Sequence, residues 1–135
     1  MLIFVRTKIR AERVKLAMDR LKIDTITLHG DKSQEDREKA IRAFKDGIKK
    51  ILIATDISAR GIDIPDIDFV INYDLPEAGE TYIHRVGRTG RAGKRGTAIS
   101  FCSTREKLLF DEIESGLIGE IVNLSLIHIL RCRRA

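Results

Sequence analysis

Arginines and glycines alternate in a stretch of eleven residues, 84–94. Four of these residues are Arg or Lys and three are Gly. Arginine presents a rigid fork of donors that matches phosphate oxygens, and glycine lets the backbone come close to a ligand. The stretch therefore indicates a polyphosphate or phosphodiester partner. A structural alternative is a helix over residues 82–88 whose last turn carries cations because the helix dipole favours them there, with Gly90 as its C-cap.

Small or polar residues follow each of three short apolar runs. Such runs are typical of strands buried on both faces, and they alternate with helical repeats along the chain. This order predicts an α/β fold, a parallel β-sheet with helices on both faces, in a single domain. Ligands bind beyond the carboxyl ends of the strands in such sheets, where helix N-termini supply N–H donors for anions. The runs are residues 2–5, 25–28 and 51–54, and the residues after them include Thr7, His29, Gly30, Asp31 and Thr55.

Arg37 is expected to reach the same edge of the sheet from a helix. Ser33 is the expected N-cap of that helix, and Arg37 precedes the apolar residues Ala40 and Ile41 by three and four positions. Its side chain should therefore emerge beside the strand ends, with Gln34 on the same side. Together these residues predict a tract for phosphates along one edge. The alternative is that each of them merely caps a helix or forms a turn.

Composition and charge narrow the class of protein. The chain has 135 residues, 43% of them hydrophobic and 33% charged, which is ordinary for a globular domain. No apolar run approaches the roughly 18 residues that span a bilayer, so no membrane partner is expected. Three of the five net positive charges come from arginines in residues 124–135, so any nucleic-acid site must be a local arrangement of groups. The two cysteines are poor disulfide candidates, which favours a cytoplasmic setting.

Five motifs in order resemble the C-terminal RecA-like domain of DEAD-box ATP-dependent RNA helicases, within superfamily 2. The resemblance runs from about residue 2 to residue 122 and implies that the predicted sheet is RecA-like. The His84-Arg85 pair favours RNA-directed members over DNA translocases of the superfamily, and the Cys102 region resembles bacterial members. The motifs are motif IV at 4–8, HGD at 29–31, QxxR at 34–37, motif V at 54–64 and motif VI at 84–91.

The resemblance implies two sets of site residues. Arg88 and Arg91 would reach the γ-phosphate of ATP, with Arg91 as the arginine finger. Asp63 would contact the ribose, and His84 would link the nucleotide site to another domain. The second set would hold the RNA backbone without reading its sequence; its members are Thr7, Gly30, Arg37 and Thr55, supported by Gln34 and Arg60. Four aromatic residues are expected in the core instead of on bases: Phe44, Tyr82, Phe101 and Phe110.

Two motifs that hold Mg-ATP are missing from the sequence. It contains no GxxxxGK[ST] loop and no Asp-Glu-Ala-Asp. In the family both lie in a preceding N-terminal RecA-like domain, which would bind ATP and Mg²⁺, so no metal site is expected in this chain. The chain alone is therefore expected to be inactive as an ATPase. A stand-alone, non-enzymatic RNA-binding module is the alternative function, and a DNA translocase is a third.

The last residues depart from the family pattern. The helicase domain is expected to cover residues 1–122. Residues 123–135 resemble a translated cloning or sequencing-adapter scar and are expected to be disordered. The rival interpretation is a basic RNA-binding extension, which Arg131, Arg133 and Arg134 would supply.

Overall fold

The computed structural model describes residues 1–64, 67–90, 95–117, 121–123 and 129–134. Contacts between residues divide the chain into two compact units, Met1–Pro65 and Asp66–Ala135. None of the described helices combines the length and the apolar character that a membrane span requires.

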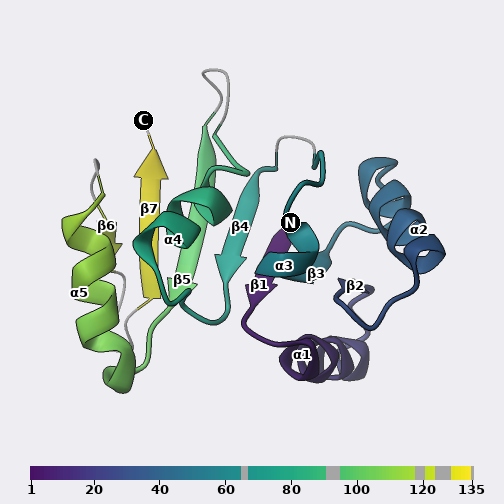
Figure 1. The fold of residues 1–135 in the computed structure, drawn as a ribbon, viewed down its shortest axis with the longest axis horizontal. Coiled ribbons are helices and arrows are strands. Elements are labelled where there is room, and N and C mark those ends of the chain that lie inside the picture. The colour runs from purple at the N-terminus through teal and green to yellow at the C-terminus, as the bar shows by residue number, and fades with distance from the viewer. Residues whose placement is uncertain (65–66, 91–94, 118–120, 124–128, 135) are drawn as a thin grey trace. The chain divides into compact units, whose positions relative to one another are not determined.

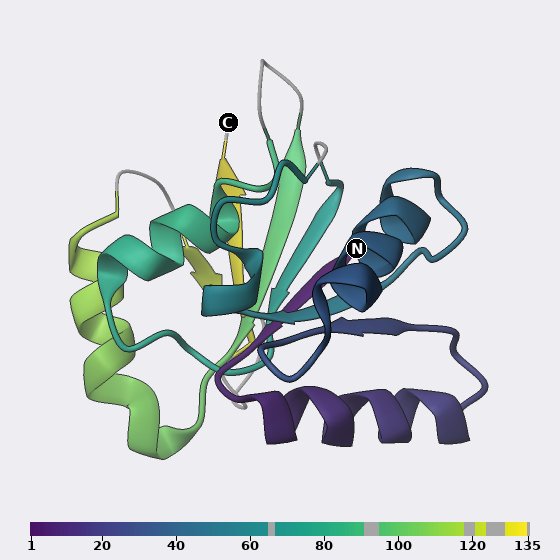
Figure 2. The ribbon, with the colours of Figure 1, turned by 45° about the vertical axis from the view of Figure 1, so that its right-hand side comes forward.

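The first unit is a parallel three-stranded sheet in the order β2-β3-β1 (Figure 1). Residues Leu2 and Ile26 of the two outer strands both pair with Leu52 of the central one. Figure 2 shows α1 and α2 on opposite sides of these strands. The chain crosses the sheet in one direction from β1 to β2 and in the other direction from β2 to β3, so right-handed crossovers place the two helices on opposite faces. The elements are β1 (Leu2–Val5), α1 (Lys8–Arg20), β2 (Ile26–Leu28), α2 (Gln34–Lys45), β3 (Leu52–Thr55) and the single turn α3 (Asp56–Ala59).

The predicted strands and caps of this unit are confirmed, and α1 buries residues mainly in its first turns. Every residue of β1 and β3 is buried, and Thr7 and Ser33 cap α1 and α2. On α1, however, Ala11 and Val14 are buried, whereas Leu21 just after the helix is 70% exposed. The helix has 13 residues, or about 20 Å, and a strand of four residues spans about 13 Å. The last turns of α1 therefore extend beyond the strands.

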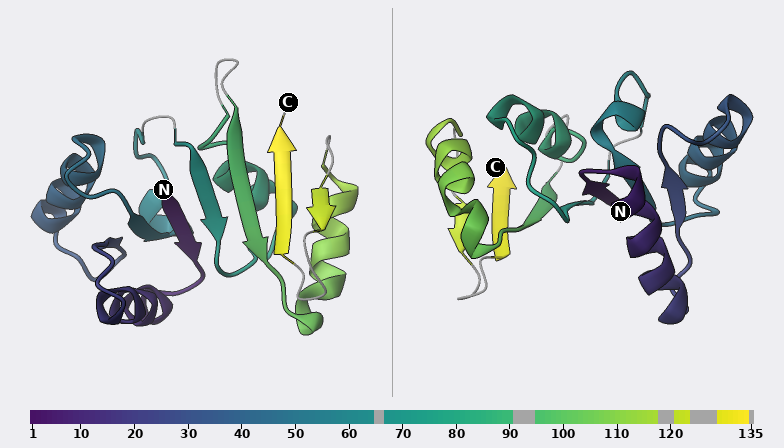
Figure 3. Two further views of the ribbon diagram at one scale, coloured as in Figure 1. Left: turned by 180° about the vertical axis from the view of Figure 1, so that it is seen from behind. Right: turned by 60° about the horizontal axis from the view of Figure 1, so that its bottom comes forward.

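The second unit has the strand order β4-β5-β7-β6, seen from behind in Figure 3. The β4–β5 pair is parallel, and β7 pairs antiparallel with both β5 and β6. Helices α4 and α5 contact each other and lie on one face of this sheet (Figures 1 and 3). The elements are β4 (Phe69–Asn72), α4 (Gly79–Val86), β5 (Gly96–Phe101), the 3-10 turn η1 (Thr104–Glu106), α5 (Lys107–Ser115), β6 (Ile121–Asn123) and β7 (Ile129–Arg134).

Strand β7 differs from the disorder expected over residues 123–135. It pairs with β5 along all six residues, from Gly96 opposite Arg134 to Phe101 opposite Ile129. The physical reason is that β5 would otherwise present an edge of unpaired N–H and C=O groups. The antiparallel strands add to the parallel pairs that the sequence predicts. The interpretation of this segment as a scar stays a prediction.

The aromatic residues follow the predicted core only in part. Tyr82 and Phe110 are buried as expected, and Phe44 is half-buried. Phe101 is 41% exposed, contrary to expectation, and its ring stacks edge-on against Tyr73 with 6.0 Å between centroids. Phe101 is the last residue of β5, and its neighbour Ser100 takes the buried face. The alternation of side chains along a strand therefore turns Phe101 outward.

Candidate nucleic-acid interface

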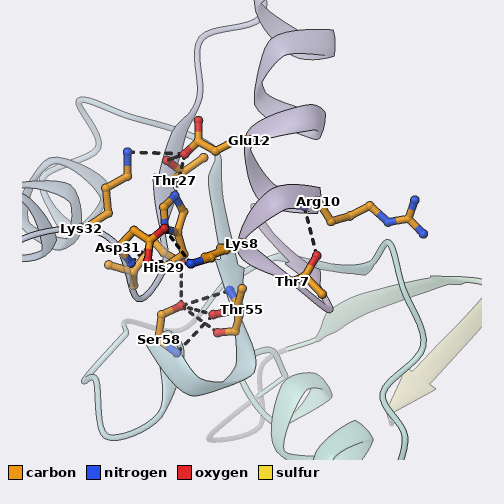
Figure 4. Close-up of polar contacts among 11 residues, drawn as sticks. Thr7, Lys8, Arg10, Glu12, Thr27, His29, Asp31, Lys32, Thr55 and Ser58 are labelled. Carbon is orange, nitrogen blue, oxygen red and sulfur yellow. Dashed lines mark hydrogen bonds and ion pairs between the residues drawn. The ribbon is translucent and has the colours of Figure 1, made fainter.

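Three turns at the carboxyl ends of β1, β2 and β3 are tied together by side chains (Figure 4). The ammonium of Lys8, after β1, lies 2.9 Å from each carboxylate oxygen of Asp31, after β2. The hydroxyl of Ser58, after β3, donates to the carbonyl of Leu28 at 2.6 Å. The residues that the sequence places after three separate strands thus share one edge of the first unit.

Arg37 reaches this edge from the first turn of α2, as predicted. Its guanidinium lies 3.5 Å from the carbonyl oxygen of Ser58, which is a long and weak hydrogen bond. The side chain is half-buried. A guanidinium has five N–H donors, so a single weak bond leaves Arg37 able to bind an anion.

Thr7 and Thr55 both cap helices, and their hydroxyls differ in exposure. Thr7 is exposed, and its oxygen accepts from the backbone N–H of Arg10 at 3.2 Å. Thr55 is buried, and its hydroxyl lies 2.9 Å from that of Ser58 in a reciprocal capping box. The Thr7 side chain is therefore open to a ligand, whereas the Thr55 side chain holds the third turn in place.

The second turn is shaped by a residue that the sequence analysis missed. Glu12 on α1 accepts from Thr27 at 3.0 Å, and its Oε1 lies 2.7 Å from Nε2 of His29 (Figure 4). The hydrogen bond from His29, supported by Thr27 and the nearby charge of Lys32 and opposed by burial, lowers the pKa of the Glu12 carboxyl from its ordinary value. Thr27 lies on β2 and His29 directly follows the strand, so the two-residue spacing favours one face for both, a signal that an acceptor on the covering helix would meet them.

Gly30, Gln34 and Arg60 are the remaining members of the predicted RNA set. A side chain added at Gly30 would meet nothing within 4 Å, so the backbone there is open. Gln34 is exposed and donates to Glu38 of its own helix at 2.9 Å. Arg60 is exposed at the end of α3. The structure therefore leaves Gln34 and Arg60 outside the bonds that join the three turns.

Asp63 also belongs to the first unit and is open to solvent. Its side chain is 92% exposed, and it lies 3.4 Å from the ammonium of Lys45. An ion pair in such an exposed position contributes little free energy. The carboxylate is thus free to accept hydrogen bonds from a hydroxyl group.

The predicted phosphate-binding residues of motif VI lie on and after α4 in the second unit. His84 is exposed, and its ring lies 3.9 Å from Glu80. Arg88 is half-buried, and its carbonyl accepts from the N–H of Ile67 at 3.1 Å. Arg91 lies outside the described residues. The helix ends at Val86 with Gly87 as C-cap, so the alternative that made Gly90 the cap is wrong; Gly90 instead takes a positive φ of 69° in the turn that follows.

A buried polar network fixes α4 to the sheet of the second unit. Arg85 is only 2% exposed and donates to the carbonyl of Asp74 at 2.7 Å and to the Asn72 side chain at 3.3 Å. Asn72 donates to Ser100 at 2.9 Å, and the Ser100 hydroxyl lies 3.3 Å from that of Tyr82. In the sequence, Arg85 is recognisable only as part of the family motif. Its spacing of three residues from Tyr82 places both on one face of the helix.

Comparison with known proteins identifies the family. The helicase conserved C-terminal domain family matches residues 1–93. The DEAD-box ATP-dependent RNA helicase 5 of Oryza sativa subsp. japonica is 46% identical over 123 residues, 91% of this chain and 22% of the relative.

Solved structures agree with that sequence match. The E. coli DEAD-box protein SrmB, bound to regulator of ribonuclease activity A, gives a TM-score of 0.81 at 39% identity over 87% of this chain and 69% of that one. The S. cerevisiae protein Dbp5, bound to RNA and ADP BeF3, gives 0.79 at 40% identity over 84% of this chain and 31% of that one.

The comparisons confirm the RecA-like α/β fold that the motifs predicted. The chain spans 22% of the length of the rice helicase. Its bacterial origin stays a prediction, because the relatives include plant and fungal proteins. The family match covers more than half of the 135 residues, and the chain belongs to the helicase conserved C-terminal domain family, as the C-terminal RecA-like domain of a DEAD-box RNA helicase.

Proposed function

We propose that this chain is the C-terminal motor domain of an ATP-dependent RNA helicase that works in the cytoplasm. It binds the sugar-phosphate backbone of RNA along the edge formed by the three joined turns of the first unit. It also supplies arginines to ATP that is held, with Mg²⁺, mainly by an N-terminal RecA-like domain. Because contacts to the backbone carry no direct sequence information, the RNA is bound without sequence preference.

The joined turns are the observation that carries this proposal. Thr7 offers an exposed hydroxyl, Gly30 an open backbone, and Arg37 a guanidinium with spare donors. Phosphate oxygens are acceptors that suit all three kinds of donor. Dbp5, which is 40% identical, was solved with RNA bound, and this supports RNA as the partner.

The nucleotide contacts are proposed for Asp63, His84, Arg88 and Arg91. The exposed carboxylate of Asp63 fits an acceptor for ribose hydroxyls, and the exposed ring of His84 can contact a neighbouring domain. ATP would supply the phosphoryl group whose developing charge the arginines offset. Dbp5 was solved with ADP BeF3 as well as RNA, which supports a nucleotide as the second partner.

An exchange of Arg37 for alanine tests the RNA edge. We expect Arg37→Ala to weaken the binding of a labelled oligouridine of about 12 nucleotides by roughly three- to tenfold, because a charge-assisted hydrogen bond is lost. The slope of log affinity against log salt should also decrease by about 0.7 for the lost phosphate contact. Fluorescence anisotropy titrations at several salt concentrations measure both quantities.

Arg42→Ala is the matched control. Arg42 lies on the same helix, is exposed, and has the same charge. If Arg37 acts only through its positive charge, both variants should lose the same amount of RNA affinity. The proposed edge instead predicts a clear loss of RNA affinity for Arg37→Ala only. Equal affinities for both variants would contradict the proposed site.

A further inference from the structure

We propose that Glu12 is a positioning residue for RNA binding, which acts through His29 on the turn formed by residues 29–31. Glu12 accepts a hydrogen bond from Nε2 of His29 and so fixes how the ring lies. The other ring nitrogen then accepts a hydrogen bond from the backbone of Asp31, and the turn presents Gly30 to a phosphate. This inference rests on the proposed RNA edge of the first unit.

The geometry brings three donors to one oxygen atom. Oε1 of Glu12 lies 3.0 Å from the Thr27 hydroxyl, 2.7 Å from Nε2 of His29 and 3.5 Å from the Lys32 ammonium (Figure 4). The His29 side chain is 6% exposed and that of Glu12 is 44% exposed. A buried ring between two elements has few orientations available, so the carboxylate of Glu12 largely decides how the ring lies.

The second ring nitrogen decides the form of His29. The backbone N–H of Asp31 lies 3.3 Å from Nδ1 of His29 and can only donate. Nδ1 must therefore carry no proton, which places the single ring proton on Nε2, facing Glu12.

The turn also orients a cation at the RNA edge. Asp31, whose N–H bonds the ring, pairs through its side chain with Lys8, the residue next to Thr7. The chain of contacts therefore runs from Glu12 through His29 and Asp31 to the first turn. A change at Glu12 should therefore alter the position of two of the three turns of the proposed RNA edge.

Charge and positioning predict opposite effects when Glu12 is removed. A carboxylate close to a phosphate site repels RNA, so loss of its charge alone would strengthen binding. Loss of its positioning would weaken binding. We expect Glu12→Ala to weaken the binding of the labelled oligouridine by about three- to tenfold, although the protein becomes more positive.

Two further variants separate the causes. Asp19→Ala removes a carboxylate from the same helix, where Asp19 pairs with Lys15 at 2.8 Å, and should leave affinity unchanged or slightly higher. Glu12→Gln keeps an acceptor oxygen for Nε2 of His29 and should regain most of the affinity. A purely electrostatic role predicts the same gain for all three variants and would overturn the proposal.

Nitrogen NMR of the ring provides a readout that does not depend on RNA. The ¹⁵N shifts of His29 in the full chain should show a protonated Nε2 and an unprotonated Nδ1, and Glu12→Ala should shift the Nε2 signal because its hydrogen bond is lost. A proton on Nδ1 in the unchanged protein would overturn the proposal, whether or not Glu12→Ala folds.

The Arg37 variant separates this inference from the function on which it rests. If Arg37→Ala weakens RNA binding while Glu12→Ala does not, the positioning role is wrong and the RNA edge stands. If neither variant alters RNA binding, both the edge and the positioning role are wrong.

Discussion

The Thr7 hydroxyl can serve as a helix cap and as a ligand at the same time. A hydroxyl has two acceptor sites and one donor. The cap uses an acceptor, because the N–H of Arg10 donates to Thr7, so the proton remains for a phosphate oxygen. The predicted choice between a cap and a binding residue is therefore not exclusive at this position. At Thr55 burial limits the hydroxyl to its structural contact with Ser58.

Among the glycines that the structure describes, Gly96 is one at which an added methyl group should be disruptive. A Cβ atom there would clash with the Thr89 hydroxyl oxygen and with the backbone nitrogen of Gly90. Thr89 in turn donates to the carbonyl of Ile67. We expect Gly96→Ala to lower the free energy of unfolding by about 1–3 kcal/mol through overpacking, as measured by urea denaturation.

Gly79→Ala is the control for that prediction. Gly79 is the first residue of α4, and an added Cβ would meet nothing within 4 Å. Its free energy of unfolding should change by no more than about 0.5 kcal/mol. Equal stability for the two variants would show that the turn after α4 can yield to a methyl group.

Two neighbouring residues of helix α4, His84 and Arg85, lie in different surroundings. Successive side chains on a helix point about 100° apart, so Arg85 is buried against the sheet while His84 is exposed. The buried arginine bonds the side chain of Asn72 and the carbonyl of Asp74. The helix that carries motif VI is thus fixed to its sheet by one of the motif's own arginines.

Removal of the Arg85 guanidinium should be costly. We expect Arg85→Ala to lower the free energy of unfolding by about 3–5 kcal/mol, because buried partners are left without their donor. Arg85→Lys should fall between this variant and the unchanged protein, since it keeps the charge and loses the planar fork. Urea denaturation followed by circular dichroism measures both. Arg105→Ala, at an exposed arginine, should cost no more than about 0.5 kcal/mol; a similar loss there would refute the special role of Arg85.

The whole molecule holds only part of the proposed ATPase. The chain spans 22% of the length of the rice relative, and its sequence contains neither the phosphate-cradling loop nor Asp-Glu-Ala-Asp. The proposed activity therefore belongs to a protein in which this domain is joined to an N-terminal RecA-like domain.

The joined protein should show RNA-stimulated phosphate release, and this chain alone should show none. Arg91→Ala in the joined protein should lower kcat by about 10³, as expected for loss of an arginine finger, while Arg105→Ala should keep kcat near normal. Steady-state phosphate release with and without oligouridine measures these effects. Robust, Arg91-dependent hydrolysis of ATP by the isolated chain would contradict the proposal that an N-terminal RecA-like domain is needed to hold ATP. RNA binding without any hydrolysis by the joined protein would favour the stand-alone binding module.

The family, the α/β class, most element positions and the residues at the strand ends follow from residue types and their spacing along the chain. These features are local: Thr7, Ser33 and Thr55 cap the helices that follow them, and each motif is a short run of neighbours. Residue type and spacing are enough to predict such features.

Which distant groups meet, in contrast, depends on how the elements pack. Glu12 and His29 are 17 residues apart, and Ser58 bonds the carbonyl of Leu28 across 30 residues. Arg85 is buried by the way α4 packs on the sheet of its unit. Such contacts depend on how helices lie across strands, and the periodicity of one element does not contain that information.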